Sequence, residues 1–202
     1  IFINKKDLVY RLEIKYKYRV LMTRTNDIFI PLDRRGKIAN DRGGDIFISI
    51  HVNAAKRKSA KGIETYYLGR GLTGRARETA ARENGEVIFS VHDNDVQRIL
   101  IDMEANRKIN NSVCLARKIQ DRLSQGMRKF YRGIKDLGVK EGPFYVLHKT
   151  YMPSILVEVG FITNFQEEKR LSRSSYLERI AANIAKGIQN VFPIQEKCAP
   201  TI

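Results

Sequence analysis

Two side chains in apolar surroundings are the strongest candidates for chemistry in this sequence, His51 and Glu158. His51 ends the apolar run 45–51 (DIFISIH), and Glu158 lies inside the run 154–159 (SILVEV). Burial raises the pKa of a carboxyl toward neutrality, which suits a general acid or base, and an imidazole at a strand end suits a metal ligand or a general base. The structural alternatives are a hydrogen-bonded histidine and a buried ion pair between Glu158 and an arginine.

Taken together, one imidazole and one carboxyl predict metal-assisted hydrolysis. A Lewis-acidic ion lowers the pKa of its bound water to about 7, and the carboxyl then carries a proton from that water to the leaving amine. Zinc takes about three protein ligands, so this pair alone does not complete a zinc site. Glu64 is interpreted as structural, His92 as solvated, and His148 as a weaker candidate for the same edge of the sheet.

The elements that must position these residues alternate between strands and helices. Strands are predicted at 19–23, 45–51, 62–68, 144–148 and 154–159. Helices are predicted from Pro31 to Gly43, over 75–84, and over 177–191. Residues 95–125 are predicted to be helical in one piece or in two, with 110–112 as the candidate break or cap. The strand 45–51 is apolar on both faces, as in a central parallel strand. The sequence therefore predicts a single α/β domain with a mainly parallel central sheet flanked by helices.

The composition excludes several classes of protein. With 202 residues, 43% of them hydrophobic and 29% charged, the chain fits one globular domain rather than a disordered, collagen-like or coiled-coil protein. No apolar run reaches the ~18–20 residues that a membrane span needs. The net charge of +15 predicts an anionic partner such as nucleic acid, anionic lipid or an acidic wall polymer; the alternative is a solvated basic surface.

The two cysteines are far apart in the sequence and form neither a metal motif nor a disulfide framework. Cys114 is predicted to be a core residue and Cys198 an exposed thiol, which leaves the redox compartment open. The chain begins with Ile1 and shows no signal-peptide pattern, so a processed product or a fragment is expected.

Several segments together resemble the zinc-dependent N-acetylmuramoyl-L-alanine amidases of the amidase 3 family. They occur in the family's order and spacing, over about residues 19–192. They are LMTRTND (21–27), LDRRGKIAN (32–40), DIFISIHVNA (45–54), KGIETYYL (61–68), PSILVEVGFITN (153–164) and EEKRL (167–171). The resemblance implies a phosphorylase/hydrolase-like α/β fold. It also implies a peptidoglycan hydrolase that cleaves the amide between the lactyl group of N-acetylmuramic acid and L-alanine.

The resemblance also implies a zinc ion, Zn2+, and a role for each matching residue. The family holds zinc by a His after the first strand, a Glu opening the first helix, and the His of the SIH motif, which corresponds to His51. The catalytic Glu of the family's VExGF motif corresponds to Glu158, which would deprotonate the water and protonate the departing nitrogen. Asn53 is expected to bind substrate or to support the site, and Arg24 to support it.

The sequence departs from the family at its beginning. The 23 residues before Arg24 are too few for the family's first strand, zinc-His loop and Glu-opened helix, and no His precedes His51. Residues 1–3 resemble the tail of that strand, and Lys5 stands where the zinc Glu is expected. The loop is either deleted or lies outside the sequence. The chain as written is therefore expected to bind zinc poorly, although its parent protein is expected to be an active amidase.

Residues 69–106 correspond to a segment that is inserted in family members acting in cell division, where a helix can block the zinc. Glu78, Glu83 and Glu86 are the candidate blocking ligands. The resemblance thus implies autoinhibition relieved by an activator protein, and the alternative is a solvated surface helix. Residues 1–192 are predicted to form the amidase catalytic domain and 193–202 a C-terminal tail.

The predicted function is peptidoglycan hydrolysis in the cell envelope, periplasmic or extracellular. Peptidoglycan and an activator protein are the expected partners, without nucleic acid and without a membrane span. Two alternatives stay open: a non-catalytic wall-binding relic with an incomplete zinc site, and a basic nucleic-acid-binding protein. Against the second, no helix-turn-helix signature and no basic strand interleaved with aromatic residues stands out. Zinc content would separate enzyme from relic, and salt-titrated DNA binding would separate either from the nucleic-acid protein.

Overall fold

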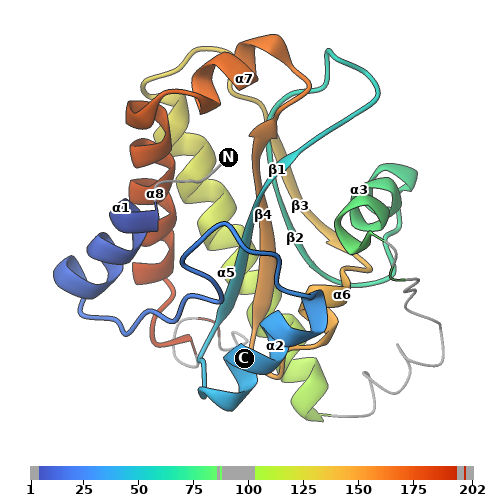
Figure 1. Cartoon of the computed structure of the whole chain (residues 1–202), viewed down its shortest axis with the longest axis vertical. Helices are drawn as coiled ribbons and strands as arrows, with labels where there is room; N and C mark the ends of the chain where they lie inside the picture. The colour runs from blue at the N-terminus through green and yellow to red at the C-terminus, as the bar shows by residue number, and fades with distance from the viewer. Residues whose placement is uncertain (1–4, 86, 88–102, 195–197, 199–202) are drawn as a thin grey trace.

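A four-stranded sheet forms the centre of the molecule (Figure 1). The computed structural model describes residues 5–85, 87, 103–194 and 198. In spatial order the strands are β1 (Phe47–Asn53), β4 (Ser154–Phe161), β2 (Ile63–Leu68) and β3 (Asp136–Gly142). β1 pairs with β4 and β2 with β3 in parallel, whereas β2 and β4 are antiparallel. The predicted α/β domain with a mainly parallel sheet is confirmed.

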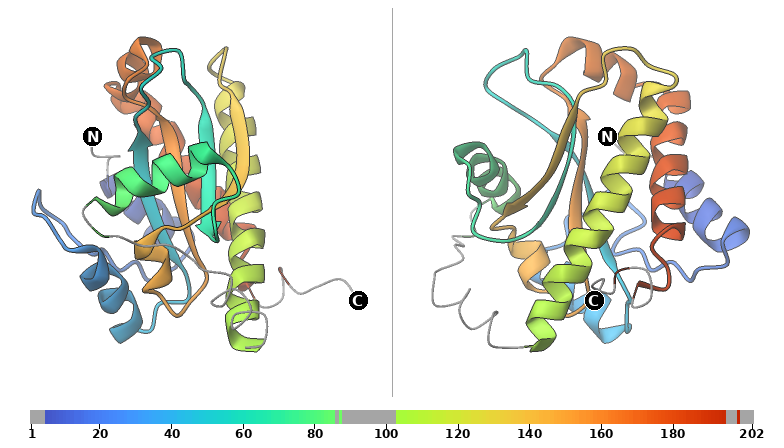
Figure 2. Two further views of the ribbon diagram at one scale, coloured as in Figure 1. Left: turned by 90° about the vertical axis from the view of Figure 1, so that its right-hand side faces the viewer. Right: turned by 180° about the vertical axis from the view of Figure 1, so that it is seen from behind.

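Helices cover both faces of this sheet (Figure 2). On one face lie α5 (Met103–Arg128) and α8 (Ser174–Gln189), with α1 (Lys5–Tyr10) and the π-helical turn η1 (Arg11–Lys15) packed outside α8. On the other face lie α2 (Leu32–Asp41), α3 (Gly74–Asn84) and α6 (Tyr145–His148). α7 (Phe165–Leu171) follows β4 at the upper end of the molecule in Figure 1. None of the described helices combines the length and the apolarity that crossing a membrane requires.

β4 divides the interior into two cores, because its side chains alternate between the two faces of the sheet. Ile155, Val157 and Val159 pack into the larger core with α5 and α8, whereas Leu156 packs into the smaller core with residues of α3 and α6. All eight residues of β4 are buried. Glu158 has the same parity as Leu156, so it faces the smaller core and the helix α3.

Some predicted elements are wrong, and each has a local cause. Residues 19–23 have no regular structure, and the segment 144–148 is the helical turn α6 rather than a strand. Phe144 and Leu147 are both fully buried at a spacing of three, which is a helical and not a strand period. The predicted break at 110–112 is also wrong, because Ser112 donates from its Oγ to the carbonyl of Lys108 at 2.7 Å and α5 continues.

The sequence interpretation also missed β3 and misplaced β1. The sequence of β3 (DLGVKEG) is polar and half-buried, and Gly138 takes a φ of 76°, so it lacks the apolar alternation of a typical strand. β1, expected to be central, pairs only with β4 among the described strands and lies at an edge of the sheet. β4 and β2 are the central strands.

The expectation that the two cysteines form no disulfide is wrong as well. Cys114 of α5 and Cys198 form a disulfide with a Cα–Cα distance of 5.7 Å. Ile194, beyond the predicted domain end, is buried in the larger core. Sequence separation could not reveal this pairing, since the two cysteines meet only through the packing of α8 against α5. The residues 1–3, expected to continue a strand, lie outside the described residues.

Candidate active site

The sheet register brings His51, Glu158 and Glu64 into one row. His51 of β1 is the partner of Glu158 of β4 across the parallel pair, and Glu64 of β2 is the partner of Glu158 across the antiparallel pair. Residues paired in this way project from the same face of a sheet. The row therefore faces α3. The pairing of β1 with β4 brings His51 next to Glu158, as expected from the sequence.

Glu158 is the most unusual ionisable group in the row. It is fully buried, and neither of its carboxylate oxygens has a hydrogen-bond partner within the described structure. Burial raises its pKa well above the ordinary value, and the nearby charges of Glu83 and Glu64 raise it further, while Arg82 opposes them. An arginine thus lies near Glu158, but the ion pair considered as the structural alternative is not formed.

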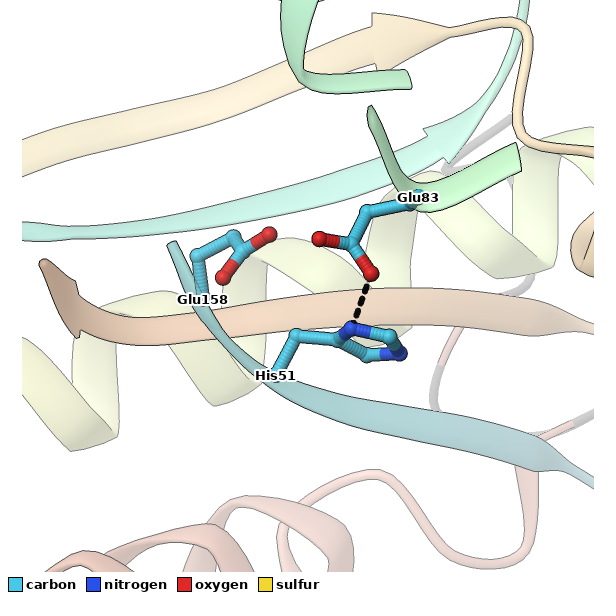
Figure 3. Close-up of side chains that lie close together, drawn as sticks. All are labelled: His51, Glu83 and Glu158. Carbon is cyan, nitrogen blue, oxygen red and sulfur yellow. Dashed lines mark ion pairs between the residues drawn. The ribbon is translucent and has the colours of Figure 1, made fainter. Parts of the chain in front are cut away.

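The helix α3 brings a second carboxylate to His51. Its N-terminus is capped by Thr73, whose Oγ1 accepts from the backbone N–H of Ala76 at 3.2 Å. Ala76 and Ala80 are buried on its inner side, and Glu83 continues that side one turn further. The Oε2 of Glu83 forms an ion pair with Nδ1 of His51 (Figure 3).

His51, Glu83 and Glu158 form a group that could hold a metal ion. One ligand atom from each residue lies within 4.8 Å of the others. A histidine nitrogen and carboxylate oxygens are accepted zinc ligands, and the two unpartnered oxygens of Glu158 are suited to a cation or a proton. Figure 3 shows the three side chains converging from β1, α3 and β4 on one point.

Asn53 connects the sheet to α3. It is buried, its Nδ2 donates to Oε1 of Glu64 at 2.8 Å, and its Oδ1 accepts from Arg82 at 3.0 Å. Glu64 in turn pairs with Lys140 of β3, which agrees with the structural role predicted for this carboxylate. The substrate-binding role predicted for Asn53 stays a prediction, because both ends of its amide are engaged within the protein.

The remaining candidates lie elsewhere. Glu78 is exposed on the outer side of α3, while Glu86 and His92 lie outside the described residues. His148 belongs to α6, whose Leu147 carbonyl accepts from Oγ of Ser154 at 3.3 Å. α6 therefore lies at the beginning of β4, whereas His51 pairs near the other end. Arg24 donates to the carbonyl of Ile28 at 2.6 Å.

Sequence reasoning named Glu83 but could not separate it from Glu78. A signal was present, since Ala76, Ala80 and Glu83 follow each other at intervals of four and three residues along one helical side. Glu78 falls outside that side. Arg82 and Lys140, which hold Asn53 and Glu64, were missed because nothing in their local sequence distinguishes them from the many other cationic residues.

Comparisons with known proteins point to one family. The profile of the family described as N-acetylmuramoyl-L-alanine amidase matches residues 5–190. The chain is 34% identical to N-acetylmuramoyl-L-alanine amidase AmiC of Neisseria meningitidis serogroup B over 178 residues, covering 85% of this chain and 42% of that protein. It is 33% identical to N-acetylmuramoyl-L-alanine amidase AmiA of Salmonella typhimurium, with 85% and 60% covered. The chain thus spans about half the length of these curated relatives.

A solved structure shows the same fold. The crystal structure of an N-acetylmuramoyl-L-alanine amidase from Clostridium difficile 630 superposes with a TM-score of 0.69 at 26% sequence identity. The match covers 93% of this chain and 79% of the other.

Proposed function

The chain belongs to the amidase 3 family of N-acetylmuramoyl-L-alanine amidases, and from this we propose that it hydrolyses peptidoglycan. The bond cut is the amide between the lactyl group of N-acetylmuramic acid and L-alanine. The observation that carries this proposal is the pairing of His51 with the fully buried, unpartnered Glu158 on adjacent strands. A site of this kind suits hydrolysis better than binding alone, because a buried carboxyl without a partner costs stability.

Zinc is the metal that we propose for this site. His51 would hold it, together with Glu83 while α3 stays in its observed position, and Glu158 lies within reach of the same point. When bound, zinc polarises a carbonyl and lowers the pKa of water to about 7. The imidazole of His51 and the carboxylate of Glu83 are ligand types that zinc accepts, and Glu158 is kept for the proton transfer.

Glu158 is the proposed proton carrier. Its raised pKa makes the ionised carboxylate a stronger base than an ordinary exposed glutamate and keeps the transferred proton on the carboxyl until it is delivered. One of its oxygens takes a proton from the attacking water. The same carboxyl then gives that proton to the amide nitrogen of L-alanine as the C–N bond breaks. His51 and Glu158 therefore perform different tasks, the first holding the metal and the second moving the proton.

We further propose that α3 is an autoinhibitory element. In the observed position Glu83 occupies Nδ1 of His51, and Arg82 occupies Oδ1 of Asn53. Displacement of α3 would free both of these atoms at once, and Asn53 could then contact substrate. A protein that binds α3 and draws it away would act as the activator, as in the family members that act in cell division.

We place the protein in the cell envelope, periplasmic or extracellular. The disulfide between Cys114 and Cys198 supports this location, because such bonds persist in oxidising compartments and are rare in the cytosol. The proposed substrate is in the same place.

The function is tested by replacing the proton carrier. Glu158→Gln keeps the shape of the side chain but cannot carry the proton, so release of stem peptides from purified peptidoglycan should fall by about 100-fold or more. Glu178→Gln, an exposed change on α8, is the matched control and should leave the rate unchanged. Undiminished hydrolysis by Glu158→Gln, with zinc supplied to both proteins, would refute the assignment.

A further inference from the structure

A large share of the positive charge is collected at one end of the molecule. The segments concerned are the β1–β2 connection (54–62), the α5–β3 connection (129–135) and α7. In these 23 residues, nine Lys and Arg residues stand against two Glu residues, a net charge of +7 out of the chain's +15. Seven of the cations are exposed and define what we call the cationic end. They are Lys56, Arg57, Lys58, Lys129, Arg132, Lys135 and Lys169.

Hydrogen bonds hold these segments side by side, although they are far apart in the sequence. Nδ2 of Asn164 donates to the carbonyl of Lys58 at 2.9 Å, and the guanidinium of Arg170 donates to the carbonyl of Arg132 at 2.8 Å. The carbonyl of Lys135 accepts from the N–H of Ile63 at 2.9 Å. Figure 1 shows α7 and both connections together at the top of the molecule. The cations therefore form one surface and not separate tails.

The two glutamates of these segments do little to neutralise that surface. Glu167 is buried and uses its carboxylate internally, accepting from the N–H of Gly62 at 2.9 Å and from the N–H of Phe161 at 2.8 Å. Only Glu168 is exposed. Within the described part of the chain, none of the seven cations takes part in an ion pair. Cations that are left unpaired and close together attract a polyanion rather than support the fold.

The cationic end adjoins the candidate active site. β1 enters the connection 54–62 two residues after His51, and β4 reaches its last residue three residues after Glu158. The two strand ends are joined there, since the N–H of Ala55 donates to Oγ1 of Thr163 at 3.1 Å. A polymer that binds across the cationic end would therefore pass close to the residues proposed to cut it.

We propose that the cationic end is a second contact for peptidoglycan, recognising the free carboxylates of stem peptides beside the one that is cut. This inference rests on the proposed function for the identity of the polymer. Each exposed contact is weak and screened by salt, but a polymer with repeated carboxylates engages several at once and is retained by their combined effect. The surface holds the enzyme on its insoluble substrate and contributes nothing to the bond-breaking step.

The test measures binding separately from cleavage. Purified sacculi are co-sedimented with the Glu158→Gln protein, which binds without cutting, over about 50 to 500 mM NaCl. A second protein carries in addition Lys56→Gln, Lys58→Gln, Lys129→Gln and Lys135→Gln. A third carries Arg19→Gln, Arg34→Gln, Arg42→Gln and Lys118→Gln, four exposed cations outside the cationic end. Both sets remove the same charge, so any difference between them reports position. Circular dichroism confirms that both proteins are folded.

We expect the four lysine changes to weaken binding about tenfold at ~150 mM salt and to flatten its salt dependence, with less than a twofold change for the control set. Sacculi whose carboxyls have been amidated should bind the parent protein as weakly as native sacculi bind the lysine variant. Equal losses in the two variants would overturn the proposal. So would tighter, lysine-dependent binding to duplex DNA than to sacculi.

Failure of the proposed function gives a different result. The wild-type chain and the Glu83→Ala variant, which lacks the blocking carboxylate, are assayed in parallel with zinc on a soluble muramoyl peptide, too short to span the cationic end. If neither protein cleaves that substrate, the amidase assignment fails whatever the sedimentation shows. If it is cleaved and the two variants bind sacculi equally, only the cationic end is refuted.

Discussion

At the scale of single residues, the candidate site is organised around an electrostatic conflict. Glu158 is buried without a hydrogen-bond partner, and the carboxylates of Glu83 and Glu64 both raise its pKa. A buried charge in this position is unfavourable, so the folded protein favours the protonated carboxyl. Glu64 lies in the same row but avoids the conflict, because Lys140 and Asn53 satisfy it. Two glutamates on neighbouring strands thus have opposite properties, and only one is prepared to exchange a proton.

This conflict predicts how stability changes with pH in the metal-free protein. Below the ordinary pKa of 4.5, Glu158 is protonated in both the folded and the unfolded states and has no effect. As the pH rises, the unfolded chain releases the proton while the folded one resists, so the wild type loses stability up to the folded-state pKa. Glu158→Gln has no such ionisation, so its free energy of unfolding at neutral pH should exceed that of the wild type by about 1–3 kcal/mol.

Urea unfolding between about pH 4 and pH 8 measures the gap between the free energies of unfolding of Glu158→Gln and the wild type. Glu178→Gln is the control for an exposed carboxyl. The gap should widen as the pH rises. A gap that narrows with rising pH, or a glutamine variant less stable throughout, would contradict the unpaired state of Glu158.

At the scale of elements, the contacts that hold α3 on the sheet are weak enough for another protein to displace the helix. The apolar side chains that it buries are only two alanines, Ala76 and Ala80, so little hydrophobic free energy holds it. Its C-terminal end is fastened by polar contacts: Asn84 donates to the carbonyl of Pro143 and accepts from the N–H of Tyr145, both at 2.9 Å. Its contacts with the site are polar too: the ion pair of Glu83 with His51 and the hydrogen bond from Arg82 to Asn53. Hydrogen bonds and ion pairs of this kind are readily replaced by contacts with another protein.

The autoinhibitory role of α3 predicts an activating substitution. Glu83→Ala removes the carboxylate that occupies His51 and should raise the rate of peptidoglycan hydrolysis up to about tenfold, the equivalent of about 1.4 kcal/mol in the opening of α3. Glu78→Ala lies on the exposed side of the same helix and should have no effect. Turbidity loss of a peptidoglycan suspension gives both rates. Reduced activity of Glu83→Ala, together with reduced zinc content, would instead make Glu83 a required ligand.

The elements also show where sequence reasoning succeeds. β1, β2, β4, α2, α3 and α8 were predicted close to their observed bounds because each carries a strong apolar period or a clear start and stop signal. His51 and Glu158 could be brought together in advance, since both lie on apolar strands. β3 and α6 could not be predicted, because a polar edge strand and a single helical turn are decided by neighbours distant in the sequence. The partners of Asn53 and Glu64 were hidden for the same reason.

At the scale of the whole molecule, the two cores are supported differently. The smaller core, beneath α3 and α6, lies beside the site and is covered by short helices. The larger core is enclosed by α5 and α8 and is closed by the disulfide from Cys114 of α5 to Cys198. The displacement proposed for α3 therefore takes place on one face of the sheet, whereas the core on the other face is closed by the disulfide.

Loss of that disulfide should destabilise the entire fold and leave the chemistry of the site intact. The bond joins positions 84 residues apart, a segment that includes β3, β4 and α8, so it restricts the unfolded chain strongly. The chain-entropy relation gives a contribution of about 4.6 kcal/mol for a loop of this length. Replacing both cysteines by serine should lower the midpoint of thermal unfolding by several degrees, and reductant should lower that of the wild type to the same value.

The serine protein should show no response to reductant and should keep its rate on a soluble muramoyl peptide at a temperature where it is folded. Identical midpoints for oxidised and reduced wild type would show that the bond does not form, and would remove its support for an oxidising compartment.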